Sequence, residues 1–302
     1  MSVIPADAAP VVGDGERHRP WRVLLATAWG QHRTKIGVAI TASLVVIAVI
    51  GPFVTPYPPD QGVEGQLPFA SPSGDAWLGT DTLGRDTFSR FLAGGYTVLV
   101  LSGLSTAMGV ALGVVVGLTA AYSRGKLDDL LMRTMDVVLS FPQIVFALIL
   151  AATVGPALWL LVLAVGLTTI PRAARVVRGA AVEVVERDYV RAAEAIGLSR
   201  RRILFSEVLP NITSPLVVET SLRLTFNVAV VAGLSFLGFG LQPPAADWGL
   251  MINENKNGLV IQPWPVVLPV VAIGLLTIGT SLIGDGLARA AIGIERGRQG
   301  RE

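Results

Sequence analysis

Long stretches of apolar residues, separated by short polar segments, dominate the pattern along the chain. A helix rises 1.5 Å per residue, so roughly 20 apolar residues cross the ~30 Å hydrocarbon core of a bilayer. Such stretches predict six membrane-spanning helices, at 36–53, about 97–122, about 130–154, 156–170, within 212–241, and about 264–283. Only a few residues around Gly155 separate the third from the fourth. The expected fold class is therefore an all-α membrane protein with six transmembrane helices.

Composition supports this class and excludes several others. Of the 302 residues, 52% are hydrophobic and only 15% are charged, and the mean hydropathy is +0.60, whereas a soluble domain carries about 25% charged residues. The chain has no cysteine, which excludes disulfide-stapled folds and thiolate metal sites, and its hydrophobicity excludes intrinsic disorder. A net charge of +2 does not indicate a nucleic-acid binder. We therefore expect the chain to lie in a lipid bilayer and to bind no nucleic acid.

The distribution of lysine and arginine predicts the orientation. With both termini in the cytoplasm, twenty of the 24 basic residues fall on the inner side, and only Arg85, Arg90 and Lys256 fall outside. This matches the excess of positive charge found in cytoplasmic loops. Four tryptophans also fall on the outer side, where they suit anchoring at the membrane interface: Trp77, Trp159, Trp248 and Trp264.

These patterns divide the chain into consecutive segments. No cleavable signal peptide is evident, so the first span is expected to be a retained anchor. Residues 1–20, rich in alanine, proline and polar residues, are expected to be disordered. The predicted organisation is a cytoplasmic segment 1–35, a first transmembrane helix 36–54, an external segment 55–96, a membrane core 97–285 containing a cytoplasmic loop 171–211, and a cytoplasmic tail 286–302.

Some polar and small residues lie inside the predicted spans. Glu219 and Arg223 stand four residues apart and can pair on one helix face, and Asn227 follows one turn later. Charges inside a membrane are costly and face the protein interior or a water-filled cavity. Glu219 and Arg223 therefore form either a self-neutralising pair or, with Asn227, the lining of a polar translocation pathway. Arg133 and Asp136 can pair in the same way. Small residues at every fourth position of the second span predict close helix packing: Ser105, Gly109, Gly113, Gly117 and Ala121.

Sequence motifs for catalysis are absent. The chain contains no HExxH, GxSxG, CxxC or GxxxxGK[ST] motif, and its two histidines, His18 and His32, both lie near the N-terminus. We therefore expect no catalytic residue, no bound cofactor and no metal site in this chain. A non-catalytic membrane subunit is the expected class.

The loop 171–211 contains two short helical patterns. In Tyr189–Ile196, Ala192, Ala193 and Ile196 can share one face, and Gly197 can end this helix in a left-handed conformation. Ser199 can then cap a second piece that carries three arginines and an apolar face and ends at Pro210. The pattern alone fits equally well a helix that inserts into a groove on a partner protein and one that lies on anionic lipid.

This loop resembles the EAA loop of ATP-binding-cassette (ABC) importer permeases, in which EAA is followed by three residues, a glycine, and a final Leu-Pro. The matching positions are Ala192, Ala193, Gly197, Leu209 and Pro210. The chain departs from the pattern at Arg191, which replaces the glutamate, and at Glu207, which replaces a late isoleucine.

Further segments resemble the C-type permease subunit of dipeptide, oligopeptide and nickel importers. They are WLGTDTLGRDTFSR at 77–90, the Phe141-Pro142 pair, GLSFLGFGLQPPAADWG at 233–249, and IGDGL at 283–287. The resemblance covers about residues 36–290, and its segments occur in the family's order.

The resemblance implies a type I ABC importer permease fold in the plasma (inner) membrane. It implies as partners a second homologous permease, two ATPases that bind ATP and Mg, and an extracytoplasmic substrate-binding protein. The ATPase-docking residues would be Asp188, Tyr189, Arg191, Ala192, Ala193, Gly197, Leu198, Arg200, Arg201, Leu209 and Pro210. The external family segment would carry Trp77, Gly79, Asp81, Gly84, Arg85 and Asp86, either touching the binding protein or bracing the outer gate.

Peptides are the expected cargo, with nickel or another small solute as the alternative. A stand-alone secondary carrier would need an ion-coupling site near the membrane midplane and no ATPase. A membrane scaffold would need neither. The EAA-like loop favours the permease, because neither alternative has a reason to keep that spacing between the fourth and fifth spans.

Overall fold

A computed structural model describes residues 20–123, 125–155 and 157–299. The expectation of disorder over residues 1–20 lies outside these ranges, except for Pro20, which begins a helix. The described residues are almost entirely helical, and extended pairing among them is limited to two isolated bridges, Gly62 with Arg85 and Thr80 with Asp86.

Five helical segments are long and apolar enough to cross a membrane. Their helices are α2 (His32–Ile50), α3 (Thr87–Ser123), α6 (Leu158–Val185), α9 (Thr213–Phe236) and α11 (Trp264–Gln299). The predicted third span is broken into α4 (Lys126–Ser140) and α5 (Gln143–Val154), which meet at 79° next to Pro142 and give a sixth span only if they are counted together. The sequence therefore located the apolar stretches correctly but did not predict this bend.

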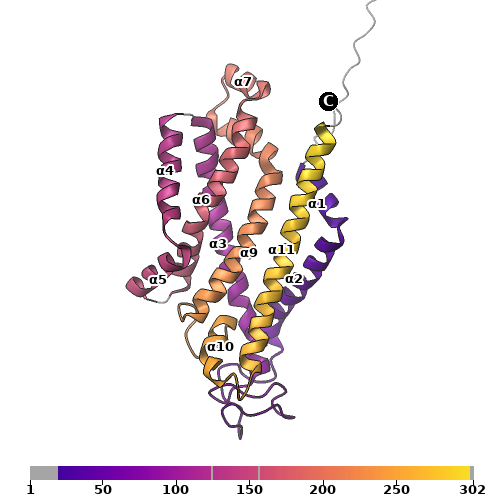
Figure 1. The fold of residues 1–302 in the computed structure, drawn as a ribbon, viewed down its shortest axis with the longest axis vertical. Helices are drawn as coiled ribbons and strands as arrows, with labels where there is room; N and C mark the ends of the chain where they lie inside the picture. Colours follow the sequence, from indigo (N-terminus) through magenta and orange to yellow (C-terminus); the bar gives the residue numbers. More distant parts are fainter. Residues whose placement is uncertain (1–19, 124, 156, 300–302) are drawn as a thin grey trace, which may run out of the picture.

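The long helices run side by side along the long axis of the molecule (Figure 1). The short helix α7 (Asp188–Ala195) lies at one end, and α10 (Trp248–Asn255) lies at the other, where the long 51–86 segment also gathers. We call these the α7 end and the α10 end. The short helix α1 (Pro20–Trp29) packs against α11 through the buried Leu24 and Ala28.

Small residues hold α3 close to α6, as the spacing predicted. A Cβ placed on Gly109, Gly113 or Gly117 would lie 2.8, 3.1 and 2.6 Å from a backbone carbonyl oxygen of α6. Only glycine leaves room for such an approach, so these residues set the distance between the two helices.

Helices α3, α6 and α11 extend well beyond their predicted bounds, and α11 continues to Gln299 instead of ending at about residue 283. Helix α3 starts ten residues before the predicted span, because its polar first turns are buried against α10 rather than exposed to water. Helix α6 continues through Pro171 to Val185, although we predicted a loop from residue 171. A proline inside a membrane helix is tolerated where neighbouring helices compensate for the lost backbone bond, and Pro171 is buried here.

Candidate functional sites

At the α7 end, the backbone of the EAA-like loop is a short helix closed by a glycine. Gly197 has a φ of +81°, and the amides of Gly197 and Leu198 donate to the carbonyls of Glu194 (3.0 Å) and Ala193 (3.1 Å). The predicted left-handed stop at Gly197 is therefore confirmed. Ser199 occupies the N-cap position of α8 (Arg200–Arg202), but its side chain makes no capping bond.

The predicted end at Pro210 is wrong. A π-helical turn, η2 (Ile203–Val208), and a 3-10 turn, η3 (Leu209–Ile212), join α8 directly to α9, so the chain is helical from Arg200 to Phe236. Pro210 is accommodated inside this helical run because the π-helical turn before it and the 3-10 turn around it depart from the regular α-helical hydrogen bonding that a proline interrupts.

The two faces of α7 differ sharply. Val190 and Ala193 are buried in one apolar cluster with Ile203 and Val208, which fixes α7 to the following turn. Tyr189, Ala192 and Ile196 point away from that cluster and are exposed, Ile196 by 76%. Ala193 therefore does not share a face with Ala192 and Ile196, because the 100° advance per residue turns it toward the core.

Charged and aromatic groups surround this loop. The Arg200 guanidinium lies over the Tyr122 ring at 5.8 Å from its centroid, linking the loop to the last turn of α3. Tyr189 is 40% exposed, and the partial burial of its phenol raises the pKa of that group. Of the remaining predicted docking residues, Asp188, Arg191 and Arg201 are exposed, and Leu198 and Leu209 pack against the apolar cluster.

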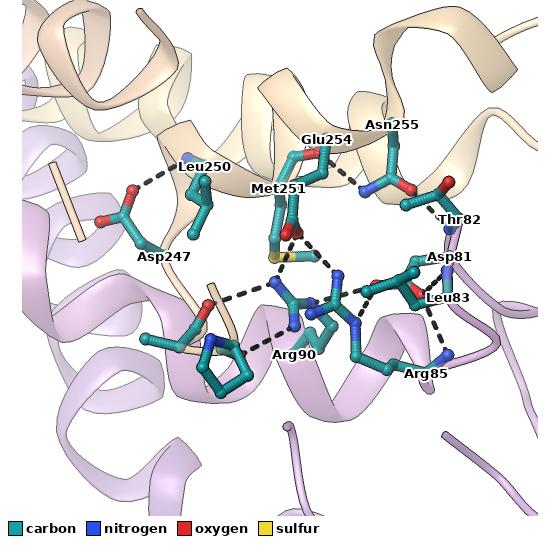
Figure 2. Close-up of polar contacts among 12 residues, drawn as sticks. Asp81, Thr82, Leu83, Arg85, Arg90, Asp247, Leu250, Met251, Glu254 and Asn255 are labelled. Atoms are coloured by element: carbon teal, nitrogen blue, oxygen red, sulfur yellow. Dashed lines mark hydrogen bonds and ion pairs between the residues drawn. The ribbon is translucent and has the colours of Figure 1, made fainter. Parts of the chain in front are cut away.

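At the α10 end, buried charges form a second site (Figure 2). Arg85 and Arg90 are 1% and 0% exposed and both reach Glu254 of α10, at 2.7 and 2.8 Å. Asp81 contacts both arginines as well, at 2.6 Å from Arg85 and 3.4 Å from Arg90. We call these four residues the arginine cluster.

Backbone contacts extend the arginine cluster to neighbouring loops. Asn255 Oδ1 accepts from the Thr82 amide at 2.9 Å, and Arg90 donates to the carbonyls of Pro59 and Pro244 at 3.1 and 3.3 Å. Gly79 has a φ of +70°, and a Cβ there would lie 2.3 Å from the Ala70 carbonyl oxygen. The 77–90 segment is thus held rigidly against α10.

A second set of contacts at this end attaches α9 to α10. Asp247 caps α10, since its Oδ1 accepts from the Leu250 amide at 3.0 Å and from Ser235 of α9 at 2.5 Å. Burial raises the pKa of the Asp247 carboxyl. Trp248 is fully buried: its indole N–H donates to the Phe91 carbonyl at 2.8 Å, and its ring stacks on the Phe91 ring. The prediction that Trp248 anchors the chain at the membrane interface is therefore wrong.

Several buried contacts at this end were not predicted from the sequence. Asp81 and Arg85 pair within the external segment. The further partner of Arg85, Glu254, lies 169 positions away, and no periodicity relates Asp247 to Ser235. Asp75 and Asp86 stay outside the arginine cluster.

The charges inside the spans have defined partners. Glu219 and Arg223 contact each other at 2.7 Å, as their spacing allowed. Asn227 is not grouped with them: it is buried between helices and donates to Thr106 at 2.9 Å and Thr169 at 3.3 Å. Its amide joins α9 to α3 and α6, which is a packing role.

Ion pairs also hold α4 against α6. Arg178 donates two bonds of 2.6 Å to Asp128, and Arg175 pairs with Asp136. Arg175 thus takes the partner that we had assigned to Arg133, because α6 runs beside α4 farther than expected.

The chain is similar to known transport proteins over nearly its whole length. Residues 109–292 match the family described as binding-protein-dependent transport system inner membrane component. The glutathione transport system permease protein GsiD of Pectobacterium atrosepticum is 35% identical over 281 residues, covering 93% of each chain. GsiD of Escherichia coli O6:K15:H31 is 34% identical over 284 residues, covering 94% of each.

A solved structure shares the fold. The inward-facing MetNI methionine ABC transporter matches with a TM-score of 0.50 and 19% identity, covering 66% of this chain and 96% of that chain. Together with the apolar helices, these similarities establish both fold and family. The chain belongs to the binding-protein-dependent transport system inner membrane component family and is a multi-pass permease of the ABC importer type.

Proposed function

We propose that this chain forms half of the transmembrane pathway of a peptide importer and receives the motion of its ATPases through α7. In this arrangement a second permease completes the pathway, two ATPase subunits bind ATP and Mg, and an extracytoplasmic binding protein delivers the cargo. The α7 end faces the cytoplasm, with both termini, and the α10 end faces outward, as the distribution of basic residues predicts.

The exposed face of α7 is the observation that carries this proposal. Tyr189, Ala192 and Ile196 offer apolar area to a partner, while Val190 and Ala193 tie the same helix to the core. A helix held this way moves as one body with η2 and the start of α9. Nucleotide-driven displacement of α7 would therefore bias the spans between two states, as a ligand biases a two-state element.

Peptide cargo is supported by the relatives. The GsiD proteins are named for glutathione transport, and glutathione is a small peptide. Import of di- or oligopeptides is thus the cargo class we propose, with nickel or another small solute as the alternative.

The docking role of α7 is tested by Gly197→Val in the assembled transporter. A valine at a φ of +81° is strained, although a Cβ there has nothing within 4 Å, so the change acts on the backbone of the loop. We expect ATP hydrolysis to continue while uptake falls at least ten-fold. Normal coupled uptake would refute the assignment.

Gly179→Val is the matched control. Gly179 is exposed on α6 with ordinary helical geometry, and its Cβ would also have nothing within 4 Å. This variant should keep coupled uptake, and both variants should elute as folded protein in detergent.

The subunit assignment is tested by purifying the tagged chain from its host in mild detergent and identifying co-purifying proteins by mass spectrometry. A second six-span permease and one or two ATPases are expected. A monodisperse chain that transports alone would instead indicate a secondary carrier, and Glu219 and Arg223 would then be the first residues to mutate.

A further inference from the structure

Two carboxylates at the α10 end remain outside the arginine cluster and face a cavity. Asp75 and Asp86 line a space of about 290 Å³ beside the start of α3, together with Pro56, Tyr57, Gly74, Trp77 and Phe88. Its described walls are acidic, aromatic or apolar, and they include no lysine or arginine. We propose that this acidic cavity binds an organic cation through its guanidinium or primary ammonium group.

Asp86 provides the specific anchor. It is only 3% exposed, and its Oδ2 accepts from the Ser89 amide at 2.8 Å and the Ser89 hydroxyl at 2.6 Å. Its Oδ1 is buried and has no hydrogen-bond donor within the described part of the chain. An unsatisfied carboxylate oxygen is costly to bury, and a cation bound in the cavity supplies both the donor and the opposite charge.

The aromatic walls favour an organic cation. Trp77 and Phe88 form a tilted pair with centroids 5.5 Å apart, and Trp77 is 65% exposed at the rim. Ring faces attract ammonium and guanidinium groups, most strongly at tryptophan. A planar guanidinium can stack on such a ring and donate to Asp86 at the same time.

A divalent metal fits the same cavity poorly. Among the described residues there is no group of three or more His, Cys, Asp or Glu side chains able to hold a metal ion. The volume exceeds what a bare ion needs and suits the end of an arginine or lysine side chain. The cavity therefore binds its ligand through the Asp86 carboxylate and through contact with the Trp77 and Phe88 rings, and Asp75 adds negative charge at the rim.

The test uses the purified full chain labelled with 5-fluorotryptophan, with the Trp77 resonance assigned by Trp77→Phe. N-acetyl-L-arginine methylamide, which carries one guanidinium, is titrated at constant ionic strength and followed by ¹⁹F NMR. A saturable shift of the Trp77 resonance is expected in the wild type. Asp86→Asn should weaken binding at least ten-fold while keeping the helix start intact, because asparagine caps helices as well as aspartate does.

Asp60→Asn is the matched control, because Asp60 is an exposed carboxylate of the same loop that does not line the cavity. It should bind like the wild type. Asp75→Asn, at the exposed rim, should weaken binding several-fold and provides a second variant should Asp86→Asn fail to fold. No saturable shift, an equal shift in Asp86→Asn, or the same shift with added sodium chloride alone would overturn the proposal.

The source of the cation is distinguished by comparing the arginine derivative with the blocked peptide acetyl-GSRSG-amide, which carries the same charge. Tighter binding of the peptide assigns the cavity to an arginine side chain of a docking protein. Equal affinity for the arginine derivative and the peptide assigns the cavity to free small cations. Either result supports the cation site itself.

Discussion

Replacing Glu254 by glutamine tests whether the arginine cluster holds the α10 end together. The change removes the charge that contacts Arg85 at 2.7 Å and Arg90 at 2.8 Å, and it leaves Asp81 as the only carboxylate of the cluster, 3.4 Å from Arg90. Both guanidiniums are at most 2% exposed, so water cannot replace the lost partner.

The expected cost is large for one substitution. Breaking a buried ion pair from one side costs about 3–5 kcal/mol, whereas an exposed pair is worth roughly 0–1 kcal/mol. At 2–4 °C per kcal/mol, the apparent melting temperature should fall on the order of 10 °C. The measurement is thermal unfolding of the detergent-purified chain, followed by tryptophan fluorescence.

Two further variants make the result specific. Glu64→Gln removes an exposed carboxylate from the same loop region and should change the free energy of unfolding by less than about 0.5 kcal/mol. Arg90→Met combined with Glu254→Gln should be less harmful than the sum of the two single changes, because it removes one of the orphaned cations. An effect of Glu254→Gln no larger than that of Glu64→Gln would refute the clamping role.

Three other changes test the packing of the spans. Gly113→Ala places a Cβ 2.6 Å from that of Ala173 and should lower the free energy of unfolding by about 1–3 kcal/mol, whereas Gly103→Ala on the same helix meets nothing within 4 Å and should be harmless in the same denaturation assay. Asn227→Leu removes the interhelical hydrogen bonds to Thr106 and Thr169 and should cost on the order of 1 kcal/mol; a neutral result in chemical unfolding would show that these bonds add no stability. Arg178→Gln breaks a partly exposed pair with Asp128 and should cost no more than about 1 kcal/mol, a difference that 1 M salt should reduce; a salt-independent effect would contradict its assignment as a screened surface pair.

The sequence predicted the features that depend on local pattern. Hydropathy located the apolar stretches, the four-residue spacing of small side chains predicted that a neighbouring helix packs closely against this face, and Gly197 predicted the end of α7. Each depends on residues within a few turns of one another, so periodicity and composition are sufficient.

Features set by distant contacts were missed. The early start of α3 depends on Arg90 meeting Glu254, and nothing near Arg90 in sequence reveals that partner. The inward turn of Ala193 depends on the turn at Ile203. The break between α4 and α5 next to Pro142 was also missed, because hydropathy averages over a bend without detecting it.

The separation between the two halves of the arginine cluster has a consequence for biosynthesis. Arg90 and Glu254 stand 164 positions apart, so a ribosome adding 5–20 residues per second makes the glutamate about 10–30 s after the arginine. During that interval Asp81 is the only carboxylate of the cluster, so two guanidiniums share one negative charge. A chain that stops before α10 keeps this imbalance. The cluster therefore closes only after α10 has been made, late in translation.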